Sequence, residues 1–289
     1  MCTGMRLRLR YNRPVKTAAN EGGNAGAGRW QRVRPAVALC ALGLVAALGV
    51  RAGWAQSVPS QNAANQNPAA RRFVVVVDAA HGGADNGAAL TTGAESADVP
   101  QAGGVAPAAA QEKDVTLAMS HTLRALLVAR GFAVVETRSG DVAMDGDARA
   151  TIANRAAAGA CVVLHATEAG SGVHLFVSSL APATRPLLMP WKTVQAGWVA
   201  ESLKLSSVLN QALGAAGKED GTAIPVTMGR TTLPGIDSMA CPAVAVEVAP
   251  LRDGARRVTS DVTNGEYATR VMQAVAAALL EWREQAGEP

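Results

Sequence analysis

Aromatic residues are scarce in this chain of 289 residues, with three Phe, two Tyr and five Trp. Hydrophobic residues nevertheless make up 49% of the chain, and most of them are Ala and Val. A core built from small aliphatic side chains fits a layered α/β protein better than a fold that depends on large rings. No internal repeat is visible. The length suits one large domain with appendages.

Most of the chain lacks an excess of basic residues, although the whole sequence carries a formal charge of +4. Residues 1–55 hold nine of the 27 Lys and Arg residues and one of the 23 acidic residues. The remainder therefore has 18 basic and 22 acidic residues, a formal charge of −4. Because the basicity belongs to the N-terminal segment, it does not indicate nucleic-acid binding.

The N-terminal segment has the pattern of an export signal. Its basic part is followed by an apolar run over 36–50, which is shorter than the roughly 20 residues of a membrane span. Gly53 and Ala55 place small residues before a cleavage site after Ala55. We therefore expect 1–55 to be a signal peptide, with an uncleaved membrane anchor as the alternative. Residues 56–72, rich in Gln, Asn, Ala, Ser and Pro, are expected to form a flexible linker.

Cysteine is also rare, and only Cys161 and Cys241 lie outside the predicted signal segment. Both stand at the start of predicted strands. If those strands are neighbours, a disulfide is expected in an oxidising compartment. Two small buried thiols are an equal alternative.

Between residues 73 and 286, predicted strands and helices alternate. Short runs of Val and other apolar residues predict strands over 73–77, 132–137, 161–164, 173–178 and 243–248. Helical spacing predicts a helix that ends at Gly131, followed by helices over 147–158, 200–213 and 267–283. Residues 91–111 are expected to form a long surface loop, and 182–197 to be irregular. The order predicts an α/β fold with three layers, in which helices flank both faces of a mostly parallel central sheet.

Polar groups appear where several apolar strands end. His81 follows the valine run, His165 follows the strand at 161–164, and Glu247 lies within the strand at 243–248. Glu112 stands at the start of the first helix. A charged residue in an apolar strand is costly unless it is paired or binds a metal. Two imidazoles and a carboxylate with an open fourth position are the ligand set of catalytic zinc.

Six segments that contain these residues resemble, in order, the zinc-dependent N-acetylmuramoyl-L-alanine amidases that cleave bacterial peptidoglycan. The resemblance covers roughly 73–283 and rests on residues 77–88, 112–117, 131–138, 149–156, 163–166 and 242–247. It departs from the family pattern at Ala80, where glycine is usual, and at Thr167, where asparagine is usual. It also departs at Ala249 and Pro250, where Gly-Phe usually follows the catalytic glutamate.

The resemblance implies a role for each of the four polar residues. His81, Glu112 and His165 would bind Zn²⁺, and Glu247 would be the catalytic general base. The reaction would be hydrolysis, by zinc-activated water, of the amide bond between the lactyl group of N-acetylmuramic acid and L-alanine. The expected partners are peptidoglycan or muropeptides and a protein activator, and the expected location is the periplasm or cell envelope.

Other interpretations of these residues remain open at this point. One alternative makes Glu112 a first-turn carboxylate favoured by the helix dipole, with Glu95 as a rival ligand. Another makes Glu247 a buried salt-bridge partner. Other polar residues of the domain are expected to be ordinary or structural: His121, His174, Arg138 and Arg149. Two further functions compete: an amidase-like domain of weak activity that binds cell-wall fragments or a partner, and another zinc hydrolase such as a peptidase.

Overall fold

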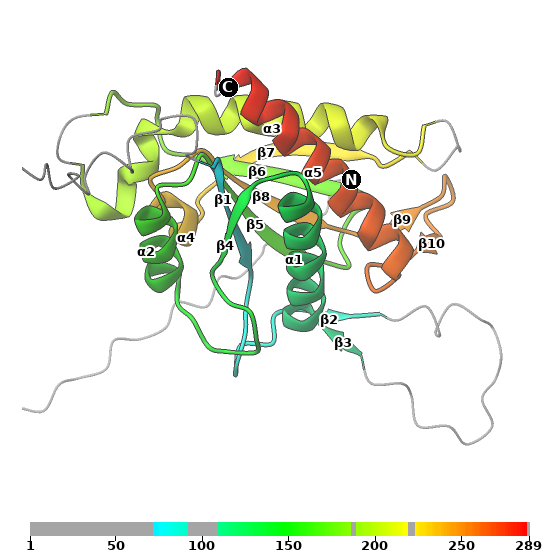
Figure 1. The fold of residues 1–289 in the computed structure, drawn as a ribbon. Coiled ribbons are helices and arrows are strands. Elements are labelled where there is room, and N and C mark those ends of the chain that lie inside the picture. The colour runs from blue at the N-terminus through cyan, green and yellow to red at the C-terminus, as the bar shows by residue number, and fades with distance from the viewer. Residues whose placement is uncertain (1–71, 92–108, 186–188, 219–222, 288–289) are drawn as a thin grey trace, which may run out of the picture. The chain divides into compact units, whose positions relative to one another are not determined.

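A six-stranded mixed sheet forms the centre of the domain in the computed structural model, which describes residues 72–91, 109–185, 189–218 and 223–287 (Figure 1). The predicted signal segment 1–55, the linker up to Arg71 and residues 92–108, which include Glu95, lie outside the described residues. The strands of the sheet are, in spatial order, β4 (Ala133–Glu136), β1 (Val74–Ala79), β5 (Ala160–Ala166), β8 (Ala243–Val248), β6 (Val173–Ser178) and β7 (Val226–Thr231).

The first four strands of this order run parallel, and β6 and β7 run in the opposite direction. The carboxyl ends of β1, β5 and β8 therefore lie at the same edge of the sheet, where β6 begins. This edge is where ligands bind in open α/β sheets. The predicted mostly parallel sheet is confirmed.

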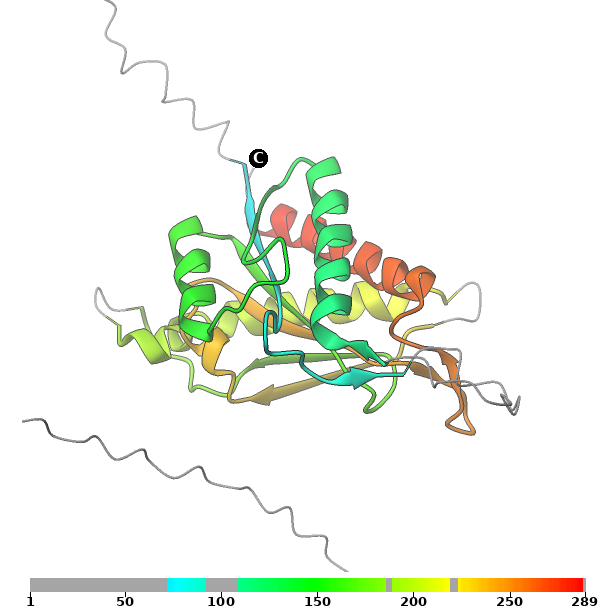
Figure 2. The ribbon, with the colours of Figure 1, turned by 90° about the horizontal axis from the view of Figure 1, so that it is seen from below.

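Helices cover both faces of the sheet and complete the three layers. On one face lie α1 (Glu112–Ala129), α3 (Val199–Ala215) and α5 (Gly265–Gln285), with α5 beside the other two (Figures 1 and 2). On the other face lie α2 (Gly146–Ala156) and the short α4 (Pro234–Asp237).

The valine run of β1 shows how the sequence specifies these two faces. Val75 and Val77 pack into the core under α1, α3 and α5, whereas Val76 packs into the smaller core under α2 and α4. All three are fully buried. Because successive side chains of a strand point to opposite faces, only a strand covered on both sides needs an unbroken apolar run.

Local signals in the sequence set the ends of the helices. Asp145 caps α2 by accepting a hydrogen bond from the Ala148 N–H at 2.8 Å, and Asn264 caps α5 by accepting one from the Tyr267 N–H at 3.0 Å. After α1, Gly131 adopts a φ of 83°, the left-handed conformation expected of a C-terminal glycine. These signals fix where α2 and α5 begin and where α1 ends.

The structure corrects several details of the sequence-based prediction. Strand β5 extends to Ala166, so His165 lies within it and not after it. Strand β7 was not predicted, because its half-exposed residues lack a clear apolar pattern. The segment expected to be irregular contains the 3₁₀ helix η3 (Trp191–Gly197). Two short pairs also lay beyond the prediction: β2 (Ala89–Leu90) with β3 (Ala110–Gln111), and β9 (Leu251–Arg252) with β10 (Val258–Ser260).

The two cysteines outside the N-terminal segment form a disulfide. Strands β5 and β8 are neighbours, and Cys161 is joined to Cys241 with a Cα–Cα distance of 6.2 Å. Both residues are fully buried in the core under α2 and α4. The bond ties the start of β5 to the segment that leads into β8, far along the strands from the edge that carries the polar residues. In the described part of the chain, no helix is long and apolar enough to cross a membrane.

Candidate metal centre

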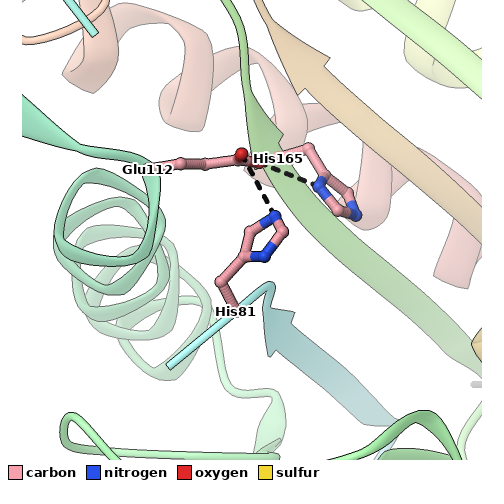
Figure 3. Close-up of side chains that lie close together, drawn as sticks. All are labelled: His81, Glu112 and His165. Carbon is pink, nitrogen blue, oxygen red and sulfur yellow. Dashed lines mark hydrogen bonds and ion pairs between the residues drawn. The ribbon is translucent and has the colours of Figure 1, made fainter. Parts of the chain in front are cut away.

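Three of the predicted site residues converge at the carboxyl edge of the sheet. His81 follows β1, His165 lies in β5 and Glu112 begins α1, and their side chains point toward one another (Figure 3). Glu112 Oε2 lies 3.1 Å from His81 Nε2, and Glu112 Oε1 lies 2.9 Å from His165 Nδ1. One ligand atom from each residue lies within 4.8 Å of the others, so the three can share a metal ion.

The spacing of these atoms fits a tetrahedral zinc site. Zinc–nitrogen bonds of about 2.0–2.1 Å at tetrahedral angles place neighbouring ligand atoms roughly 3.3 Å apart. The carboxylate–imidazole distances of 2.9 and 3.1 Å are a few tenths of an ångström shorter, as expected for direct hydrogen bonds. The residues present therefore fit zinc with small side-chain movements.

Asp85 orients the first imidazole. Its Oδ2 atom lies 2.9 Å from His81 Nδ1, and its Oδ1 atom accepts the Gly87 N–H at 3.2 Å. The hydrogen bond with His81 is the main reason why the pKa of Asp85 is lowered. With Nδ1 directed at Asp85, Nε2 faces Glu112. A carboxylate behind a metal-binding histidine commonly fixes the tautomer in this way.

Two buried arginines hold the backbone that carries His81. The His81 φ of 63° lies in the left-handed region, which costs energy for a residue other than glycine. Arg149 Nη2 donates to the His81 carbonyl at 2.6 Å, and Nη1 donates to the Ala79 carbonyl at 2.6 Å. Arg138 Nη2 donates to the Ala80 carbonyl at 2.8 Å. The two guanidinium groups thus fix three successive carbonyls and hold the strained turn in place.

Asp78 balances this buried positive charge. It is 2% exposed and accepts a hydrogen bond from Arg149 Nη1 at 2.5 Å and another from the Thr137 hydroxyl. A buried carboxylate without such partners would be strongly unfavourable. The carboxylate that ends the valine run is therefore part of the support of the candidate metal centre.

Glu112 is buried and ionised at the centre of the cluster. Burial raises the pKa of its carboxyl group, but hydrogen bonds from His165 and from the Ala88 and Ala166 N–H groups outweigh it and lower the pKa to about 2. The carboxylate is 5% exposed and contacts both histidines. A carboxylate held only by the helix dipole would face solvent, so that interpretation does not describe Glu112.

Gly87 allows this close approach. Its φ is 66°, and a Cβ atom there would lie 2.6 Å from Glu112 Oε2 and 2.7 Å from His81 Cδ2. Any side chain at this position would collide with two of the three residues of the cluster.

Glu247 lies beside the cluster, on the neighbouring strand. In β8 it is the register partner of His165, and its side chain is 30% exposed. Its Oε2 atom lies 2.8 Å from His174 Nδ1. His174 was expected to be an ordinary histidine, and the structure pairs it with the residue predicted to be the base. The other such histidine, His121, is half exposed and lies 4.0 Å from Glu136.

A comparison with known protein families assigns the chain to a family of hydrolases. The family model described as N-acetylmuramoyl-L-alanine amidase matches residues 75–281. The chain belongs to this amidase family. The match spans both histidines of the cluster, Glu112 and Glu247. A search of curated proteins found no match.

Solved amidase structures share the fold. The catalytic domain of the amidase CwlV from Bacillus (Paenibacillus) polymyxa var. colistinus is 22% identical, with a TM-score of 0.51 over 73% of this chain and 98% of that one. Ami1 from Mycobacterium smegmatis is 21% identical, with a TM-score of 0.51 over 74% and 97%. The CwlD amidase from Clostridioides difficile, solved in complex with the GerS lipoprotein, is 17% identical, with a TM-score of 0.52 over 74% and 100%.

The positions that depart from the amidase pattern are held by ordinary contacts. Ala80 is 5% exposed, and its N–H donates to the Leu164 carbonyl at 3.1 Å, which continues the pairing of β1 with β5. The Thr167 N–H donates to the Val248 carbonyl at 3.0 Å. The carbonyl of Ala249 accepts the buried Tyr267 hydroxyl at 2.8 Å. The backbone around the candidate site is therefore held by hydrogen bonds at these positions.

A cavity of about 440 Å³ opens beside the metal centre on the side of α2 and α4. His81 and His165 contribute to its wall. The rest of the wall is mostly apolar and includes Met144, Leu233, Ile236 and Met239. Charged groups in the wall include Asp85 and Arg149, which support the His81 turn, and Asp145, the cap of α2. Pockets of this size, with a few convergent polar groups, are typical of substrate sites.

Proposed function

We propose that the chain is a zinc-dependent amidase that hydrolyses the bond between the lactyl group of N-acetylmuramic acid and L-alanine in peptidoglycan. The observation that carries this proposal is the convergence of His81, Glu112 and His165 on one point in a chain of the amidase family. In this proposal, His81 Nε2, His165 Nδ1 and a carboxylate oxygen of Glu112 are the metal ligands.

Zinc held by three protein ligands would lower the pKa of a bound water to near 7 and polarise the scissile carbonyl. Glu247, on the strand beside His165, is proposed to accept a proton from the attacking water. The carboxylic acid so formed passes the proton to the nitrogen of L-alanine as the amide bond breaks. One oxygen and one proton of the water stay on the lactyl carboxyl group, and Glu247 returns to its ionised form.

The proposed setting of the reaction follows from the family and from the N-terminal sequence. The substrate is peptidoglycan or a muropeptide, so we propose that residues 1–55 direct export and that 73–286 form the catalytic domain. The family match over 75–281 supports this division. A protein activator is a further proposed partner, because the CwlD amidase is described in complex with the GerS lipoprotein.

The test is hydrolysis of a purified muropeptide by wild-type protein and by the Glu247→Gln variant. We expect the variant to bind zinc like the wild type and to lose at least about 100-fold in kcat, since it lacks the general base. Glu281→Gln, a change of an exposed glutamate on α5, is the matched control and should keep full activity. Unchanged turnover in Glu247→Gln would contradict the assigned role.

The same assay separates the two competing functions. Zinc binding by the wild type without any turnover would favour an amidase-like binding domain. Cleavage within the stem peptide would favour a zinc peptidase.

A further inference from the structure

We propose that His174 is a positioning residue that fixes the Glu247 carboxylate for proton transfer. This inference rests on the proposed function of Glu247. The contact that motivates it joins His174 Nδ1 to Glu247 Oε2 at 2.8 Å.

The topology of the sheet sets up this contact. Strands β5, β8 and β6 are successive neighbours, and His165 is the register partner of Glu247, which is in turn the register partner of His174. Register partners on adjacent strands point to the same face of a sheet. The three side chains therefore form a row that runs from the metal ligand to the base and then to the second imidazole.

The contact occupies one oxygen of the Glu247 carboxylate and leaves the other to accept a proton. When His174 is neutral with its proton on Nδ1, it donates to Oε2 of Glu247. The Oε1 atom is then the oxygen that accepts the proton of the attacking water. After that transfer Oε2 is a carbonyl oxygen and still accepts the Nδ1–H, so the carboxylic acid keeps its orientation until the proton leaves for the amine.

The surroundings restrict the imidazole to this position. A Cβ atom on Gly170, whose φ is 83°, would lie 2.5 Å from His174 Nε2, so the loop between β5 and β6 passes against the ring. The ring also meets Phe176 edge to face, with centroids 6.4 Å apart. The His174 side chain is 14% exposed, against 30% for Glu247. A confined imidazole therefore restrains a more exposed glutamate.

A structural role alone would not require a donor at this position, and this difference makes the inference testable. His174→Asn places an amide N–H near the position of Nδ1, whereas His174→Leu keeps the bulk and removes the donor. We expect His174→Leu to lower kcat by about 10- to 100-fold, the range of one hydrogen bond to a charged group. KM and zinc content should stay at wild-type values, and His174→Asn should recover most of the lost kcat.

The matched control is His121→Leu, which replaces a half-exposed histidine on α1 and should leave kcat unchanged. Wild-type kcat, or a higher value, in His174→Leu would overturn the inference. So would an equal loss of kcat and zinc in His174→Leu and His174→Asn, because that result indicates a purely structural role. Absence of hydrolysis by the zinc-loaded wild type would instead contradict the proposed function.

Nitrogen-15 NMR of the histidines supplies a measurement that does not depend on activity. The His174 signals should report a proton on Nδ1 that is hydrogen-bonded to Glu247, and this hydrogen bond should be lost in Glu247→Ala. If Glu247→Ala leaves the His174 signals unchanged, the carboxylate is not what holds the imidazole, and the inference fails even where the amidase assay gives no product.

Discussion

Replacement of Arg149 by Met tests how far the metal centre depends on its buried support. Arg149 is 7% exposed, and its guanidinium donates hydrogen bonds to the Asp78 carboxylate and to the carbonyls of Ala79 and His81. Methionine is similar in length and apolar, so the change leaves the Asp78 charge in the core with the Thr137 hydroxyl as its remaining side-chain partner.

The expected loss follows from the burial of that charge. Removing one partner of a buried ion pair typically destabilises a protein by about 3–5 kcal/mol. For a domain of this size, that loss corresponds to a fall in Tm of roughly 6–20 °C. The double variant Asp78→Asn/Arg149→Met removes the stranded charge, so its free energy of unfolding should exceed the additive expectation by about 1–3 kcal/mol.

Denaturant unfolding of the wild type, the two single variants and the double variant measures these terms. Arg155→Met changes an exposed arginine on the same helix and should stay within about 0.5 kcal/mol of the wild type. A loss of unfolding free energy below about 1 kcal/mol in Arg149→Met, or strict additivity in the double variant, would show that Arg149 does not neutralise a buried Asp78 charge.

Three further predictions concern other parts of the domain. The disulfide spans 80 residues, so Cys161→Ala/Cys241→Ala should lower the free energy of unfolding by roughly 4 kcal/mol in denaturant titrations; a loss under about 1 kcal/mol would count against it. Gly87→Ala should weaken zinc binding at least about 10-fold in competition titrations, because its methyl group meets Glu112 and His81, whereas Gly254→Ala, which meets no atom within 4 Å, should not. In the metal-free protein, the Glu112 pKa of about 2 lies below the unfolded value near 4.3. Ionised Glu112 therefore adds roughly 3 kcal/mol to the free energy of unfolding above pH 4.5, and this stability is lost as the pH falls toward 2. Glu112→Gln should remove this pH dependence, and parallel curves of stability against pH for the two proteins would contradict the prediction.

The sequence was sufficient to predict the parts of the fold that have strong local signals. The valine run predicts strand β1, and the apolar spacing predicts helix α1. His81 after β1 and His165 in β5 lie near each other because parallel strands end at the same edge of the sheet. The convergence of His81, Glu112 and His165 was predicted in this way, with the family resemblance, and the structure brings the three together.

The pairing of Glu247 with His174 could not be predicted in the same way. It depends on β6 lying antiparallel beside β8 in one particular register, and no local pattern in residues 173–178 specifies the neighbour or the direction of that strand. The hydrogen bonds of Arg138 to the Ala80 carbonyl and of Arg149 to the His81 carbonyl depend likewise on residues more than 50 positions apart. Strand register and backbone contacts between residues far apart in the chain cannot be predicted from local sequence patterns.

The most direct test of the account is the cleavage site on a defined muropeptide, read by mass spectrometry with zinc present, removed by a chelator and restored. Amidase cleavage should give two products: a glycan that ends in a free lactyl carboxylate and a stem peptide that begins with a free L-alanine amine. Both should disappear with the chelator and return with zinc. Cleavage at any other bond, or the same products at full yield without a metal, would contradict the account.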